Sequence, residues 1–138
     1  MPRQKPKFGD VFFIDLTPHT LPSQSTMKDF HPVVIVQSDI FSHNYPNTIV
    51  VPCKSFNPEK HWDYQNKRLK YIFHYLLLKE KYTYLKNNTV VKCEQIFTIS
   101  KDYLKPENYW FTLYKDDMIE ILRRMSLVIG FLDIDEEL

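Results

Sequence analysis

The chain has 138 residues, of which 43% are apolar and 25% are charged, and this composition predicts one globular domain over residues 1–138. It has only two glycines, Gly9 and Gly130, and this excludes the glycine-rich loops that cradle nucleotide phosphates. The net charge of +1 is uneven, because residues 1–105 hold 15 Lys or Arg against 9 Asp or Glu, and residues 106–138 hold 3 against 8. The basic part indicates an anionic partner, although a solvated surface with an acidic helix gives the same distribution.

The first part of the chain predicts three strands separated by polar segments. The strands are expected where β-branched and aromatic residues cluster, over residues 8–16, 31–37 and 48–53. Residues 17–30 are polar, contain two prolines and predict a long loop. Ser38 or Asp39 is expected to cap a short helical turn. Pro52 cannot donate a ladder hydrogen bond, so its strand is expected to have an edge or a bulge there.

The second part predicts a further loop, two more strands and a helix. Residues 54–70 are polar and basic and are expected to form a second long loop. Residues 71–78 favour a strand because aromatic and aliphatic residues alternate there, and residues 89–99 predict one long strand. Ser100 is expected to open a brief helical turn that ends before Pro106.

The final helix is the strongest single pattern in the chain. Its apolar residues recur at spacings of three and four and form one stripe, consisting of Met118, Ile121, Leu122, Met125, Val128, Ile129 and Leu132. The stripe is expected to pack against the core or a second subunit, and residues 132–138 form an acidic tail. Because consecutive strands are joined without crossover helices, the whole order predicts a mainly β fold, an antiparallel barrel with a C-terminal α-helix.

Cysteine and histidine spacing argues against a metal site or another cofactor. There is no CxxC pair, and the five histidines show no ligand-like spacing with carboxylates. The basic N-terminus is not followed by an apolar segment, and no run of 18 apolar residues occurs. We therefore expect a cytoplasmic protein that does not bind a membrane and keeps Cys53 and Cys93 reduced.

Three patches in this order resemble the MazF/PemK toxins, which share the SH3-like, CcdB-like barrel fold. The first patch is GDVFFIDL at residues 9–16. The second is PVVIVQSD at residues 32–39, followed by VVPC at residues 50–53, and the third is VVKCEQIFTI at residues 90–99. Together with the final helix, the resemblance covers about residues 8–131.

The resemblance implies the toxin component of a type II toxin–antitoxin system. Members of this family are homodimeric mRNA interferases that cut single-stranded RNA at short sequences without a metal, and a cognate antitoxin peptide neutralises them. The ribose 2′-hydroxyl attacks the neighbouring phosphorus, so the site needs groups that move protons and a cation that offsets the charge on the phosphate.

Two positions depart from the family's catalytic pattern. The family has an arginine before the strand proline, where this chain has His31, and a threonine after V-P-x, where it has Lys54 followed by Ser55. His31 can act as a general base or acid, Lys54 can supply the cation, and Ser55 can supply the hydroxyl. The alternative is that His31 and Lys54 are solvated residues at strand ends without a catalytic role.

Two further groups are candidates for RNA binding by their place in the resemblance. Ser23 and Gln24 stand where the family has its G-S-E-Q loop, and Lys28 is the one cation of that loop. Glu94 and Gln95 match the family's conserved pair, which faces the RNA groove. In a strand, one of these two side chains must point outward; the alternative is that they only connect strands.

Trp62 and Tyr64 lie in residues 54–70 among the cations Lys60, Lys67, Arg68 and Lys70, a combination that suits base stacking beside phosphate attraction. A subunit interface or a loop cluster would use the same residues.

For the whole protein, the alternative to a nuclease is a degenerate member of the fold that binds RNA or a protein without cleavage. A poison of gyrase, suggested only by the shared fold, ranks last.

Overall fold

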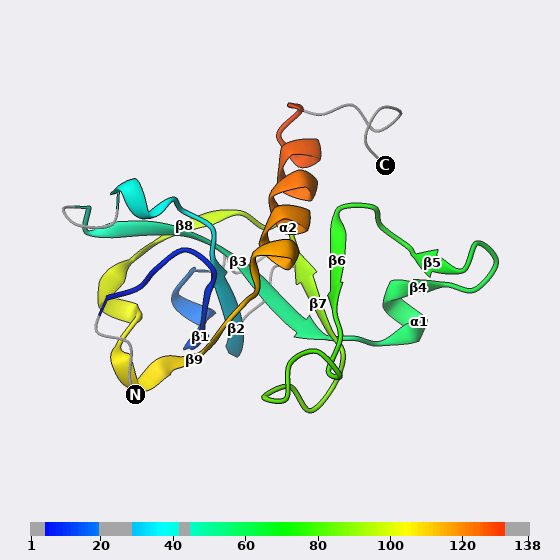
Figure 1. Ribbon diagram of the computed structural model, residues 1–138, viewed down its shortest axis with the longest axis horizontal. Coiled ribbons are helices and arrows are strands. Elements are labelled where there is room, and N and C mark those ends of the chain that lie inside the picture. Colours follow the sequence, from blue (N-terminus) through cyan, green and yellow to red (C-terminus); the bar gives the residue numbers. More distant parts are fainter. Residues whose placement is uncertain (1–4, 20–28, 42–44, 132–138) are drawn as a thin grey trace.

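The computed structural model describes residues 5–19, 29–41 and 45–131, and these form a curled antiparallel sheet with a helix beside it (Figure 1). The neighbouring strands of the sheet run in the order β6-β7-β3-β2-β1-β9, and β8 also pairs with β3. The strands are β1 (Asp10–Asp15), β2 (Phe30–Ile35), β3 (Asn47–Ser55), β6 (His74–Leu77), β7 (Thr89–Lys92), β8 (Phe97–Ser100) and β9 (Tyr109–Thr112). The predicted mainly β, barrel-like fold is confirmed.

The long strand β3 organises the sheet by changing its partner halfway along. Its first half pairs with β8 and its last three residues pair with β7, while β2 lies along its other side. The prediction of one strand over residues 89–99 is therefore wrong. The chain turns between β7 and β8, where the Gln95 amide donates to the Lys92 carbonyl, because each strand follows a different part of β3. Pro52 stands where β3 changes its partner, so its missing N–H falls at an irregular point, as expected.

The segment after β3 is ordered and is not the long loop that the sequence suggested. It forms α1 (Pro58–His61) and a small hairpin of β4 (Trp62–Asp63) and β5 (Arg68–Leu69), which lie to one side of the sheet beyond β6 (Figure 1). Asn57 caps α1 by accepting a hydrogen bond from the Glu59 amide, and Asp63 accepts two backbone amides in the hairpin turn. The Asn-Pro pair at the start of α1 was the available signal.

Other bounds differ from the predictions by smaller amounts. Strand β6 begins three residues later than expected, and β9, which was not predicted, completes the sheet beside β1. The expected turns after Ser38 and Ser100 are confirmed as short 3-10 helices. The described 3-10 helices are η1 (Thr17–His19), η2 (Asp39–Phe41), η3 (Lys101–Tyr103) and η4 (Pro106–Asn108).

The core has two parts, one on each face of the curled sheet. Because side chains alternate along a strand, the neighbours Val33 and Val34 point to opposite faces, and both are fully buried. One cluster includes Val34 and the helix residues Met118 and Ile121, and the other includes Val33 and Phe12. Burial on both faces explains why these strands appear as continuous apolar runs in the sequence.

Helix α2 (Lys115–Val128) begins against the sheet and ends beyond it (Figure 1). Its first half buries Met118 and Ile121, but Val128 is 39% exposed and Ile129, just after the helix, is 69% exposed. In this chain the first half of the predicted stripe packs against the core, and the second half stays exposed, so its predicted contact with a second subunit remains a prediction. Leu132 lies outside the described residues. No helix among the described residues is long and apolar enough to cross a membrane.

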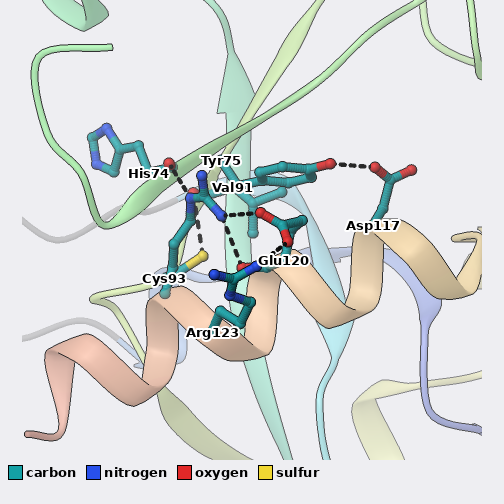
Figure 2. Close-up of polar contacts among 8 residues, drawn as sticks. His74, Tyr75, Val91, Cys93, Asp117, Glu120 and Arg123 are labelled. Carbon is teal, nitrogen blue, oxygen red and sulfur yellow. Dashed lines mark hydrogen bonds and ion pairs between the residues drawn. The ribbon is translucent and has the colours of Figure 1, made fainter. Parts of the chain in front are cut away.

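Helix α2 is anchored to the sheet at Asp117, whose carboxylate is 3% exposed. It accepts hydrogen bonds from the hydroxyls of Tyr75 and Tyr82, and the Lys81 ammonium lies 3.0 Å from it. Figure 2 shows the Tyr75 hydroxyl directed at Asp117. Two turns further along, Arg124 donates to the His74 carbonyl at 3.1 Å and packs over the Tyr75 ring. These contacts fix β6 and His74 relative to the helix.

Candidate functional site

The candidate catalytic residues meet in one groove at the end of the sheet. This His31 groove has a volume of about 800 Å³, and His31, Lys54 and Ser55 all line it. Strands β2 and β3 pair Val33 with Pro52, and extending this antiparallel register by two residues places His31 opposite Lys54. Residues opposite each other in such a pair face the same side, so the sheet itself brings the imidazole and the ammonium group to one surface.

Exposed aromatic side chains form one wall of the His31 groove. Phe13 stacks on Phe30 with 5.9 Å between ring centroids, and Trp110 contacts Phe13 edge-on at 6.1 Å. Phe13, Phe30 and Tyr84 are 44%, 56% and 60% exposed, which is unusual for such large rings. The sequence analysis missed this wall. The available signal was the alternation of side chains along β1, because Phe13 must point to the face opposite that of the buried Phe12. Such a wall is suited to stacking against unpaired bases.

The groove also holds an acidic residue that the sequence analysis did not select. Glu107 of η4 is the one carboxylate among the described residues that line the groove. Its neighbour Asn108 donates a side-chain hydrogen bond to the Phe13 carbonyl at 3.3 Å, which fixes η4 against β1. The groove is therefore lined by the imidazole of His31, two lysines, Lys54 and Lys86, the hydroxyl of Ser55 and the carboxylate of Glu107. This set can move protons and stabilise negative charge on a phosphate.

A second, smaller cavity of about 350 Å³ adjoins the His31 groove and shares Lys54 with it. We call it the lysine pocket, after Lys54, Lys60 and Lys92. Its other lining residues are His61, Tyr71, Phe73, His74, Glu94 and Gln95. Helix α1, strand β6 and the turn after β7 therefore meet here, although they are far apart in the sequence.

Glu94 and Gln95 line the lysine pocket from a turn, which corrects the expectation that they lie in a strand. One carboxylate oxygen of Glu94 lies 3.3 Å from Nε2 of His74, whose side chain is 4% exposed. Burial opposes ionisation of Glu94, but the hydrogen bond from His74 and the charges of His74 and Lys92 outweigh it, so the pKa of Glu94 falls below its usual value. The carboxylate is therefore charged at neutral pH.

The remaining candidates lie apart from both cavities or outside the described residues. Trp62 is half-buried in β4 and contacts Phe56 edge-on at 6.2 Å between centroids, so it packs the hairpin onto the sheet. Tyr64 is 71% exposed beside the hairpin turn, and neither ring lines the His31 groove or the lysine pocket. Ser23, Gln24 and Lys28 lie outside the described residues.

The described residues contain no group of three or more His, Cys, Asp or Glu that could hold a metal ion. The two cysteines, Cys53 and Cys93, are free and buried. Burial raises the pKa of the Cys93 thiol to about 12, so the thiol stays protonated and unreactive at neutral pH. The chemistry available in the described cavities therefore rests on His, Lys, Ser and Glu side chains.

His61 makes the fold sensitive to acid, because its imidazole is 4% exposed and its Nδ1 accepts the Asn57 amide at 2.9 Å. Burial lowers the pKa of His61, and His74 and the nearby lysines lower it further. As pH falls below about 6.5, the unfolded chain takes up this proton first, so stability is full above that pH and declines below it. The variant His61→Asn keeps a hydrogen-bond acceptor near the position of Nδ1 but cannot be protonated there. We expect its melting temperature to fall less than that of the wild type between pH 8 and pH 5.

An equal loss of melting temperature in both proteins would show that His61 does not cause the acid sensitivity. Burial also lowers the pKa of His19, so the His61→Asn protein should still retain part of the decline. The contribution of His61 is therefore the difference between the two proteins in how steeply the melting temperature falls with pH.

The fold of this chain has known relatives. The family model for the PemK-like, MazF-like toxin of type II toxin-antitoxin systems matches residues 7–129. MazF from Deinococcus radiodurans has a similar structure, with a TM-score of 0.67 at 13% identity over 93% of this chain and 99% of that chain. An endoribonuclease solved with its cognate antitoxin from a mycobacterial species gives 0.64 at 16% identity over 93% and 98%.

The toxin MazF-mt6 of Mycobacterium tuberculosis gives a TM-score of 0.60 at 12% identity over 90% of this chain and 98% of that chain. None of the curated protein sequences matches the chain. The identities to the solved structures are low, so those likenesses show the fold, whereas the family model matches almost the whole length. The chain therefore belongs to the family of PemK-like, MazF-like toxins of type II toxin–antitoxin systems.

Proposed function

We propose that this toxin is an endoribonuclease that cuts single-stranded mRNA in the His31 groove by attack of the ribose 2′-hydroxyl, without a metal ion. The observation that carries the proposal is that His31 lines the same groove as Lys54 and Ser55, although it lies more than 20 residues before them in the sequence. The family membership of the chain and the endoribonucleases among its structural relatives support the same reaction class.

Each group has one role in the proposed reaction. His31 takes the proton of the 2′-hydroxyl, and the oxygen attacks the adjacent phosphorus to form a 2′,3′-cyclic phosphate. Lys54 offsets the negative charge that grows on the phosphate oxygens, and the Ser55 hydroxyl donates a hydrogen bond to one of them. The 5′-oxygen leaves and takes up a proton from water. The ammonium group of Lys54 thus replaces the permanent charge that the family's arginine provides.

The proposal includes two protein partners and a compartment. Val128, Ile129 and Phe131 expose an apolar surface at the end of α2, which suits contact with a second copy of the chain or with an antitoxin peptide. One structural relative was solved with its cognate antitoxin, so we expect an antitoxin peptide here too, and a homodimer as the active form. The proposed compartment is the cytoplasm, which the mRNA substrate requires and the free cysteines support.

The direct test is cleavage of a long single-stranded RNA in the presence of EDTA. Discrete fragments that end in 2′,3′-cyclic phosphates are expected, because the attacking oxygen belongs to the substrate. A matched RNA with a single 2′-deoxyribose on the 5′ side of a mapped cleavage site should resist cutting at that site alone. Fragments that appear only when a divalent metal is added would refute the metal-independent reaction.

The second candidate is a toxin-fold protein that binds RNA or a protein without cutting. The replacement of the family's Arg and Thr by His31 and Lys54 favours it, because neither new side chain offers a bidentate fork for phosphate. Intact RNA after long incubation, together with binding measured by fluorescence anisotropy, would establish this alternative.

A further inference from the structure

The lysine pocket brings three ammonium groups together around one small cavity. Among the residues that the structure describes, no carboxylate forms an ion pair with Lys54, Lys60 or Lys92. Lys92 is half-buried, and its pKa is lowered by burial and by the charges of Lys54 and Lys60, although Glu94 opposes this. Gathering like charges costs free energy in the empty pocket, and an anion between them would recover it.

The floor of the pocket holds polar atoms that remain unpaired within the described residues. His74 is buried and uses Nε2 towards Glu94, and its Nδ1 has no hydrogen-bond partner. One carboxylate oxygen of Glu94 is also unpaired, and because this carboxylate is charged it offsets one of the three ammonium groups, which leaves the pocket with an excess of positive charge. Figure 2 shows that the His74 ring points away from α2. The backbone carbonyl of His74 faces the helix and accepts the hydrogen bond from Arg124. A small cavity that is lined by three lysines and by buried, unpaired polar atoms is typical of a ligand site and not of a hydrophobic core.

The shared residue Lys54 links the pocket to the His31 groove. Lys54 lines both cavities, so an RNA strand whose phosphates pass Lys54 in the groove can continue into the pocket. Helix α1 supplies Lys60, and the Asn57 cap, the Lys70–Glu59 contact of 2.7 Å and the buried His61 hold that helix in place. Helix α1 therefore closes one side of the cavity with Lys60 and His61.

We propose that the lysine pocket is a phosphate subsite, which holds the RNA backbone one nucleotide away from the bond that is cut beside His31. This rests on the proposed function, since it assigns the pocket to the same strand. A phosphate is favoured over an acidic peptide because Lys54 belongs to both cavities and faces a phosphate in the proposed reaction. The subsite contributes affinity and register along the strand, and it does not read the bases.

The test measures binding and not cleavage, with a short single-stranded RNA whose 2′-O-methyl riboses cannot attack phosphorus. The affinity of the wild type should fall linearly with salt on a double logarithmic plot. The double variant Lys60→Gln/Lys92→Gln should bind more weakly and reduce this slope by about 0.7, the value of one phosphate contact on a single strand. The loss should be equal for two RNAs of different base sequence, because a phosphate contact carries no sequence information.

The matched control is Lys79→Gln, an exposed lysine that lines neither cavity, and it should leave the slope unchanged. Thermal melting of each variant checks that the fold is intact. An unchanged slope in a double variant that still cuts RNA would overturn the subsite and leave the nuclease proposal standing. Unchanged RNA binding with weakened binding of a poly-glutamate peptide would assign the pocket to an acidic peptide instead. A wild-type protein that binds no RNA would overturn both proposals.

Discussion

Replacing His31 with alanine is expected to slow RNA cleavage about 10²–10⁴-fold, the range that a positioned general base contributes. The loss should fall on the chemical step and not on binding, since Lys54 and the aromatic wall remain. Single-turnover cleavage of one defined RNA measures the rate, and anisotropy with the 2′-O-methyl RNA measures affinity. Because an imidazole acts as a base only when neutral, the wild-type rate should rise with pH across the neutral range, and the variant should lose that rise.

A companion variant separates the two roles at this position. His31→Arg restores the charge that the family places there but removes the base, so we expect its binding to be retained and its pH profile to be flat. Cleavage by His31→Ala at the wild-type rate would dismiss His31 as the base. Glu107, the carboxylate among the described lining residues of the groove, would then be the next residue to test.

Replacing Asp117 with alanine is expected to destabilise the fold by about 3–5 kcal/mol, the cost of removing one partner from a buried charged network. The change leaves the hydroxyls of Tyr75 and Tyr82 and the ammonium of Lys81 without their shared acceptor. It also removes a negative charge from the first turn of α2, where the helix dipole favours it. Urea unfolding followed by circular dichroism measures the difference in free energy.

The adjacent residue provides a matched control. Asp116 also pairs with Lys81, but its side chain is 70% exposed and solvent screens the pair, so Asp116→Ala should lower the free energy of unfolding far less than Asp117→Ala. Similar losses for both variants would show that burial of the Asp117 network does not set its contribution. The contrast matters for function, because α2 and Arg124 fix β6 and with it the His74 side of the lysine pocket.

The spacing of apolar residues along the sequence was sufficient to predict the class of fold, and two segments show why. Apolar runs such as residues 31–37 can be buried on both faces only in a sheet covered on both sides, and helical spacing from Met118 to Met125 leaves few alternatives to a packed helix. The Asn57-Pro58 pair was an equally local signal for α1, and the prediction of a loop over residues 54–70 overlooked it.

Residues 89–99 show the limit of local patterns. Every residue there is compatible with a strand, but β3 curls and offers β7 and β8 different parts of its edge, so the chain must turn at Glu94 and Gln95. No property of the segment itself contains this information. Likewise, β9 was missed because its four residues depend on pairing with β1 and not on their own periodicity.

By itself, the sequence determined the antiparallel β architecture with its final helix, the family resemblance and the candidates His31, Lys54 and Ser55. These follow from short-range patterns, because side-chain alternation and motif spacing are written along the chain. Only the tertiary structure decided that these residues share a groove, that Phe13, Phe30 and Trp110 form its wall, and that Lys60 and Lys92 complete a second cavity with Lys54. The reason is that strand register and helix docking, which no single segment encodes, set which distant side chains meet.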